Sequence, residues 1–217
     1  LENAFNKVTE NEWKQSGIAL LNESLSGNKL PEAVSSAALS SLIEYCGCTN
    51  GAFYIYDSAV LKMHACHGFE FYMDHSYEIG EGIIGQAYVD HKTRVFQDSK
   101  YVANCANGPI RINHVFILPL INDNECIGVI ELGSFNGFSE LHKIFLEESG
   151  FIIALELTSA LSRMKVQAIL EEMQAQSEEL QSQHSELENL NAMLEAHTQQ
   201  LQVSEEYPSQ NLYHLNL

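Results

Sequence analysis

A heptad repeat near the C-terminal end constrains the fold of this chain more than any other feature of its sequence. Five large apolar side chains recur at every seventh position: Met173, Leu180, Leu187, Leu194 and Leu201. This spacing is typical of one seam of a coiled coil, whereas a helix packed on its own domain carries a wider apolar stripe. The repeat therefore predicts a helix that pairs with a second helix of the same kind.

The other positions of this seam are mostly polar. If the five repeating residues occupy d positions, the a positions are Leu170, Ser177, His184, Asn191 and Thr198. Polar a residues lower the stability of a coiled coil while fixing its register. Nine glutamates and no lysine or arginine lie between residues 166 and 206, which is half of the net charge of −18. We expect a marginal coiled coil that shifts between packings of similar energy. Its predicted seam consists of Leu170, Met173, Leu180, His184, Leu187, Asn191, Leu194 and Leu201.

Charge and composition exclude several classes of partner. The chain has 29 acidic and 11 basic side chains, a balance that repels phosphate backbones and anionic membrane surfaces, so we expect neither nucleic acid nor a membrane as a partner. No apolar run approaches the roughly 20 residues needed to span a bilayer, and the N-terminal stretch lacks the features of a secretory signal. Five irregularly spaced cysteines argue against a disulfide framework and predict a cytoplasmic location. The chain starts with Leu1, and we expect it to be part of a longer protein.

Hydrophobic patterning predicts an α+β domain before the coiled coil. Apolar periodicity predicts helices over residues 4–26 and 31–46, and Ser139 is the expected N-cap of a helix that continues to about Glu206, since Pro208 disfavours further helix. The predicted strands are residues 52–56, 59–66, 94–97, 114–121 and 126–134, the last two forming a hairpin. The first strand carries large side chains on both faces, so we expect both faces of a mostly antiparallel sheet to be covered. Residues 98–111 read as a long connection of the kind that often forms a functional loop or lid.

Five segments of the sequence form an ordered set: residues 49–57 (TNGAFYIYD), 80–87 (GEGIIGQA), 112–120 (INHVFILPL), 124–135 (NECIGVIELGSF) and 169–187 (ILEEMQAQSEELQSQHSEL). Together, in this order, they resemble the GAF domain found in the sensory region of bacterial multi-sensor histidine kinases. The resemblance implies a central antiparallel sheet of five to six strands. Helices pack on one face, and a small-molecule pocket with short helices and loops lies on the other. It also implies a non-catalytic sensory module that forms a parallel homodimer and signals to an output domain of the same polypeptide, a histidine kinase.

With this resemblance, the chain divides into four predicted parts. They are an N-terminal helix (residues 1–26), a GAF sensor domain (27–160), a coiled-coil signalling helix (161–206) and a tail (207–217) that is either a native terminus or an appended sequence. GAF domains bind cyclic nucleotides, bilins, haem or amino acids. The Asn-Lys-Phe-Asp-Glu motif of cyclic-nucleotide GAF domains is absent, and Cys66 precedes the helical segment where phytochrome-like domains attach bilin. No cofactor is required by the sequence.

Aromatic residues of the strands and connections are the candidate walls of a ligand pocket. The residues expected to line it are Tyr54, Tyr56, Phe69, Phe71, Tyr72, Tyr77, Ile83, Cys105 and Arg111. The alternative is that these side chains fill the core. Arg111 is the only arginine of the predicted lid, which leaves an anionic ligand open.

A haem, metal or redox site is a second hypothesis for the same domain. His64 and Cys66 are expected on one face of a strand, and imidazole and thiolate are common metal and haem ligands. Ordinary packing is the preferred explanation of these residues, and a ligand-free dimerisation domain is a third hypothesis for the chain. The sequence contains no G-x-S-x-G or H-E-x-x-H motif, and His184 is followed by Ser185 rather than by the glutamate of a kinase phosphoacceptor. The glycines of residues 80–87 lack the Lys-Ser/Thr of a P-loop and are interpreted as a turn before a short helix.

Overall fold

The computed structural model describes residues 2–68, 76–97, 101–105 and 108–213. Within this chain two compact units are distinguished, with the division between Met164 and Lys165. The first unit is an α+β domain and the second is the C-terminal part of one long helix.

A six-stranded sheet forms the centre of the first unit, and every neighbouring pair of its strands is antiparallel. Its order is β3-β2-β1-β8-β7-β4. The strands are β1 (Asn50–Asp57), β2 (Val60–His67), β3 (Ser76–Glu78), β4 (Arg94–Phe96), β7 (His114–Asn122) and β8 (Glu125–Ser134). The predicted antiparallel sheet is therefore confirmed. The predicted hairpin joins β7 to β8 through Asp123 and Asn124, which both adopt the left-handed conformation that two-residue hairpin turns require.

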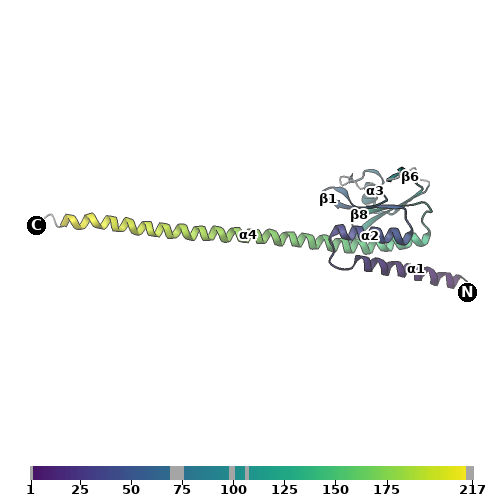
Figure 1. Ribbon diagram of the computed structural model, residues 1–217, viewed down its shortest axis with the longest axis horizontal. Helices are drawn as coiled ribbons and strands as arrows, with labels where there is room; N and C mark the ends of the chain where they lie inside the picture. Colours follow the sequence, from purple (N-terminus) through teal and green to yellow (C-terminus); the bar gives the residue numbers. More distant parts are fainter. Residues whose placement is uncertain (1, 69–75, 98–100, 106–107, 214–217) are drawn as a thin grey trace. The chain divides into compact units, whose positions relative to one another are not determined.

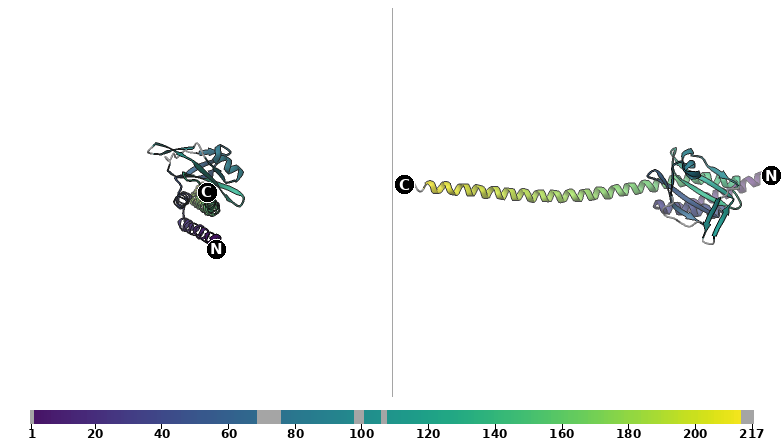
Figure 2. Two further views of the ribbon diagram at one scale, coloured as in Figure 1. Left: turned by 90° about the vertical axis from the view of Figure 1, so that its right-hand side faces the viewer. Right: turned by 90° about the horizontal axis from the view of Figure 1, so that it is seen from above.

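Helices cover one face of this sheet, as expected. They are α1 (Glu2–Leu25), α2 (Pro31–Cys46) and the first part of α4 (Glu140–Tyr213). Helix α2 and the start of α4 lie directly under the sheet, and α1 lies on their outer side (Figures 1 and 2). Pro31 occupies the first turn of α2, and Ser139 caps α4 by accepting a hydrogen bond of 3.1 Å from the backbone N–H of His142.

The opposite face of the sheet carries α3 (Gly82–Asp90) and a separate two-stranded sheet formed by β5 (Tyr101–Cys105) and β6 (Gly108–Ile112) (Figure 1). Each face has its own apolar cluster. Phe53, Phe116 and Leu132 pack toward the helices, whereas Ala52, Tyr54 and Val129 pack toward α3. The expectation that both faces of β1 are covered is thus confirmed.

Two sequence-based predictions were wrong. The long connection expected over residues 98–111 contains instead the paired strands β5 and β6, each five residues long, which the weak periodicity of this stretch did not reveal. Helix α4 does not end before Pro208 but continues to Tyr213. A proline removes one backbone hydrogen bond from a helix interior, and the neighbouring turns sustain the helix across that gap.

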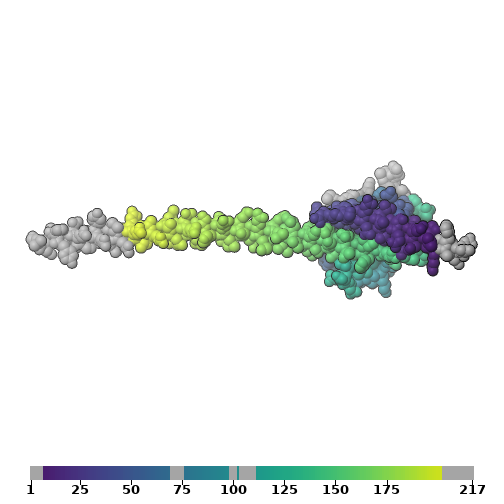
Figure 3. All heavy atoms as spheres, turned by 90° about the horizontal axis from the view of Figure 1, so that it is seen from below, coloured from purple at the N-terminus to yellow at the C-terminus, as the bar shows by residue number. Residues whose placement is uncertain are grey.

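Aromatic packing fixes α1 against the rest of the helical face. Trp13 of α1 lies 4.7 Å from Tyr45 and 5.4 Å from Phe145 between ring centroids, and Lys14 forms an ion pair of 2.7 Å with Glu148 of α4. Figure 3 shows α1 lying alongside the first part of α4 on this side of the domain. The N-terminal helix is therefore a packed part of the first unit.

Candidate functional site

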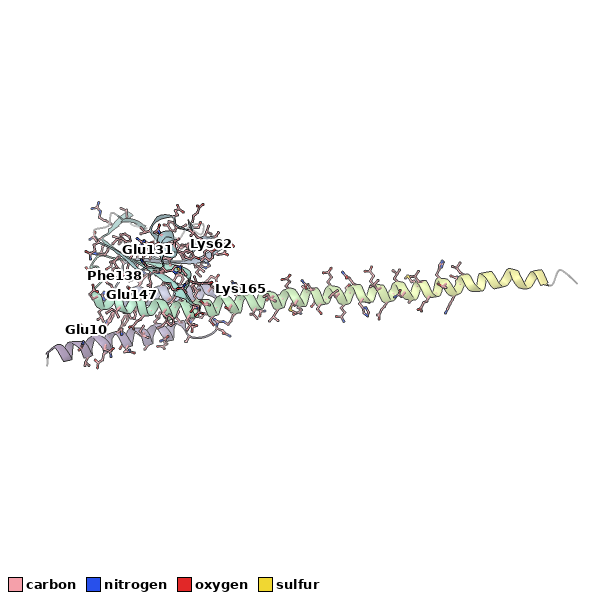
Figure 4. The ribbon with its side chains drawn as sticks, turned by 180° about the vertical axis from the view of Figure 1, so that it is seen from behind. Glu10, Lys62, Glu131, Phe138, Glu147 and Lys165 are labelled. Atoms are coloured by element: carbon pink, nitrogen blue, oxygen red, sulfur yellow. The ribbon has the colours of Figure 1, made fainter. Side chains whose placement is uncertain are left out.

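Two polar side chains are buried in the apolar layer between the sheet and α3. Asn50 of β1 and Glu131 of β8 are each only 2% exposed. Side chains alternate between the two faces of a strand, so Asn50 shares its face with Ala52 and Tyr54, and Glu131 shares its face with Val129. In Figure 4 Glu131 lies on the side of the sheet away from α4. These two residues define the polar site discussed below.

Small residues lie opposite both members of the polar site. In the register of β1 and β8, Asn50 pairs with Gly133 and Ala52 pairs with Glu131. A Cβ atom added to Gly133 would lie 2.9 Å from Cγ of Asn50, so the amide of Asn50 occupies the space above this glycine. Neither the amide nitrogen nor the amide oxygen of Asn50 has a hydrogen-bond partner among the residues that the structure describes.

Two tyrosines lie beside the polar site. Tyr54 is 2% exposed and packs edge to face on Tyr77 of β3, with 5.5 Å between ring centroids. Burial raises the pKa of Tyr77, the negative charge of Glu131 raises it further, and a hydrogen bond with Tyr54 lowers it. The site therefore combines a carboxylate, an amide and two phenol groups in a layer that is otherwise apolar.

The predicted pocket residues do not all lie together. Tyr54 and Tyr77 are in contact, whereas Tyr56 and Ile83 are 40% and 38% exposed. Tyr56 stacks instead on Tyr88 of α3, with 5.1 Å between ring centroids. Arg111 is an exposed residue of β6. Phe69, Phe71 and Tyr72 lie outside the described residues, and Cys105 belongs to β5 without a described side chain.

Sequence reasoning missed Asn50 and Glu131, because a polar residue in a strand normally faces solvent. A signal was nevertheless present. Glu131 stands between Ile130 and Leu132 in a strand whose neighbours carry large apolar side chains toward both faces. A charged residue in such a strand has no solvent-facing side available, and it is therefore buried wherever it points.

A β-bulge changes the predicted arrangement of His64 and Cys66. The register of β1 with β2 pairs Phe53 with Ala65 but Tyr54 with Met63, so His64 is the extra residue. His64 approaches Glu32 of α2, with 3.9 Å from Nδ1 to the carboxylate, while Cys66 packs against the cluster on the α3 face. The bulge therefore interrupts the strict alternation on which their expected shared face rests.

Both residues also border a shallow groove between α2 and β2. Its volume is about 270 Å³, and its lining residues are Ser36, Leu39, Ser40, His64, Ala65 and Cys66. Burial lowers the pKa of His64, although Glu32 opposes this effect. Within the described part of the chain, no group of three or more histidine, cysteine or acidic side chains is placed to hold a metal ion.

The described cysteines are poor nucleophiles in this fold. Burial raises the pKa of the Cys46 thiol. It also raises the pKa of Cys48 to about 12 and the pKa of Cys126 to about 11. Burial also raises the pKa of Cys66. Because the thiolate is the reactive form, these four side chains are held in their unreactive state near neutral pH.

The second unit presents the heptad residues to solvent. The d residues Met173, Leu180 and Leu187 are 61%, 65% and 59% exposed. Its polar side chains bond along the helix, as between Gln174 and Glu178, where the amide nitrogen donates over 3.2 Å. None of the helices in the described ranges is long and apolar enough to cross a membrane.

An antiparallel sheet with helices on one face and a small helix and hairpin over buried polar groups on the other defines the first unit as a domain of the GAF-like α+β class. A sequence model of the GAF domain matches residues 29–158, which is more than half of the chain. The chain belongs to the GAF domain family. GAF domains are typically sensory ligand-binding modules, although some related domains are enzymes. A search of curated proteins found no matching sequence.

Solved structures support the fold at low sequence identity. The GAF domain of a phosphoenolpyruvate-protein phosphotransferase from Coxiella burnetii is 14% identical, with a TM-score of 0.61 over 70% of this chain and 96% of that one. The nlh2 GAF domain of A. aeolicus in an inactive state is 18% identical, with a TM-score of 0.56 over 69% and 98%. Free methionine-R-sulfoxide reductase from Neisseria meningitidis, solved with its substrate, is 19% identical, with a TM-score of 0.57 over 71% and 93%.

Proposed function

We propose that this chain is a non-catalytic sensory module that binds a small molecule at the polar site and relays the binding event through helix α4. The observation that carries this proposal is the burial of Asn50 and Glu131 in an otherwise apolar layer. An unsatisfied buried polar group costs a fold about 1–3 kcal/mol, and groups of this kind are retained chiefly where they serve a ligand or a reaction. A bound ligand that bonds to Asn50 would remove this cost.

The layout of β8 supports a relay from the polar site to the helices. Glu131 faces the polar site, while its neighbours Ile130 and Leu132 pack on the helical face in one cluster with residues of α4. A displacement of β8 on ligand binding is therefore transmitted to the helical face, because packed interiors deform little.

Two further contacts join the sheet to α4. The side-chain amide of Asn122, at the end of β7, donates a 3.2 Å hydrogen bond to Oγ1 of Thr158 in α4. Leu118 of β7 approaches Gly150 of α4 so closely that a Cβ atom there would lie 3.1 Å from the leucine. Because these contacts join β7 to α4, a movement of the sheet moves α4 directly.

The output side of the proposal is a parallel homodimer formed by the heptad seam. In a parallel pair each g residue faces the e residue of the following heptad on the partner helix. The g residues are Ile169, Gln176, Gln183, Leu190 and His197, so none of these g–e pairs joins two glutamates. Six of the nine glutamates occupy the outward b and c positions: Glu171, Glu172, Glu178, Glu179, Glu186 and Glu206. Charge repulsion is thus weaker at the seam than the composition suggests, which supports dimerisation.

The proposed receiver of the signal is an output domain in the same polypeptide, a histidine kinase, because the acidic heptad helix after a GAF domain resembles the sensory region of such kinases. The cytoplasm is the proposed location. A haem, metal or redox role for His64 and Cys66 gains no support from the described residues, among which no third metal-binding side chain joins them.

Mass spectrometry under native and denaturing conditions tests the binding step. The chain purified gently from its host should have a larger mass under native conditions, and denaturation should release a small molecule. Asn50→Leu should abolish this difference, while Asn22→Leu, at an exposed position of α1, should retain it. A wild-type chain without any bound molecule, or one that sediments as a monomer at every concentration, would contradict the proposed function.

A further inference from the structure

We propose that the polar site recognises a ligand through a positively charged nitrogen group, such as an amine, an amidinium or a guanidinium, held by Glu131 and hydrogen-bonded beside Asn50. This inference rests on the proposed function and specifies the chemical class of its ligand. The sequence left an anionic ligand open through Arg111, but Arg111 is exposed on β6 whereas the carboxylate is buried.

The burial of the Glu131 carboxyl group is the first argument for a cationic ligand group. A carboxylate that has been removed from water is stable only when donors or positive charge surround it. It has about four acceptor positions, so neighbouring phenol groups and a ligand nitrogen can be accommodated together. The surrounding layer includes Ile84, Ile117 and Val129, all 2% exposed or less. In such a low-dielectric layer the attraction between Glu131 and a cation is stronger than at the surface.

The spacing of the site is the second argument. Asn50 and Glu131 are diagonal neighbours on one face of the β1–β8 pair, a relation in which side chains stand about 7–8 Å apart. The small residues Ala52 and Gly133 complete this square of four residues, and the amide of Asn50 lies over Gly133. A small ligand can therefore place its charged nitrogen at Glu131 and a second hydrogen-bonding group at the unpartnered amide of Asn50.

The tyrosines provide the third argument. Tyr54 and Tyr77 pack edge to face beside Glu131, and aromatic rings attract a cation through their negative faces. A phenol group carries no positive charge, so the two tyrosines accept a cationic ligand beside Glu131 without repelling it. The site as a whole thus selects positive over negative ligands.

Binding of three probes of similar shape tests this selection. The full chain, freed of co-purified molecules by unfolding and refolding, is titrated with benzamidinium, benzamide and benzoate at millimolar concentrations and followed by NMR shifts of the amides. Benzamidinium should bind at least about tenfold more tightly than neutral benzamide, and benzoate should not bind. Glu131→Gln should remove the preference for benzamidinium, whereas Glu125→Gln, at the exposed start of the same strand, should leave it unchanged.

A second variant separates recognition from a purely structural role. Asn50→Ala should weaken benzamidinium and benzamide by the same factor, because the amide is contacted regardless of charge. Equal binding of benzoate, an unchanged preference in Glu131→Gln, or no binding by any of the three probes would overturn the inference. If the natural molecule released by denaturation is neutral or anionic, the inference fails while the proposed function stands.

Discussion

Gly17 of α1 offers a test in which helix propensity and packing predict opposite results. In an exposed helix, alanine is more favourable than glycine by about 1 kcal/mol. At position 17, however, a Cβ atom would lie 2.7 Å from Cε2 of Phe145 and closer still to the ring of Tyr45. Phe145 is 1% exposed, and the Tyr45 hydroxyl donates a hydrogen bond to the backbone carbonyl of Trp13, so neither ring can move away freely.

Overpacking of this kind costs about 1–3 kcal/mol. After subtraction of the propensity gain, Gly17→Ala should lower the free energy of unfolding by about 1 kcal/mol, which corresponds to a loss of about 2–4 °C in Tm. Thermal unfolding followed by circular dichroism gives the Tm. Fluorescence reports on α1 directly, because Trp13 is the only tryptophan of the chain. In the variant, the emission of Trp13 should shift toward the emission of a more exposed tryptophan.

The exposed neighbour Ser16 supplies the control. A comparison of Ser16→Gly with Ser16→Ala measures the propensity difference where no ring is in contact, and alanine should be the more stable by about 1 kcal/mol. If alanine stabilises position 17 as it does position 16, with unchanged Trp13 fluorescence, the close packing of α1 on Tyr45 and Phe145 is refuted.

Three other predictions concern protonation, thiol reactivity and the seam. Burial lowers the pKa of His142 below 6.5, and its Nδ1 accepts a 3.4 Å hydrogen bond from the backbone N–H of Ser139. The unfolded chain therefore binds the proton first, so the free energy of unfolding should fall as the pH drops below about 6.5, and this fall should be smaller in His142→Gln. Iodoacetamide should modify Cys46 and Cys48 much more slowly in the folded chain than in urea, as followed by mass spectrometry; equal rates would contradict their burial. Isoleucine at the four polar a positions together should tighten dimerisation at least about tenfold in sedimentation equilibrium, and unchanged affinity would argue against the assigned register. Those positions are Ser177, His184, Asn191 and Thr198.

Much of the fold could be predicted from the sequence, because long apolar patterns determine it. The strands around Phe53, Phe116 and Ile130 alternate or run apolar over several residues, and each was found within one or two residues of its expected position. Pro31 and Ser139 marked the starts of α2 and α4 through local chemistry that tertiary packing does not override.

The candidate site was harder to predict, because it depends on how strands align with one another. The extra residue His64 in β2 cannot be recognised without the register of β1. The juxtaposition of Asn50 with Gly133 joins residues more than eighty positions apart and follows only from the β1–β8 pairing. Glu131 could have been identified as buried from its apolar flanks, but its proximity to Tyr77 could not.

Hydrogen exchange in α4 tests the central claim most directly, namely that occupancy of the polar site alters this helix. The chain as purified is compared with the chain stripped of bound molecules by unfolding and refolding, and exchange is followed by mass spectrometry for peptides covering residues 151–164. These residues include Thr158, the partner of Asn122. We expect slower exchange there when the site is occupied, together with slower exchange in β1 and β8. Protection limited to β1 and β8, with identical exchange across α4, would contradict the relay.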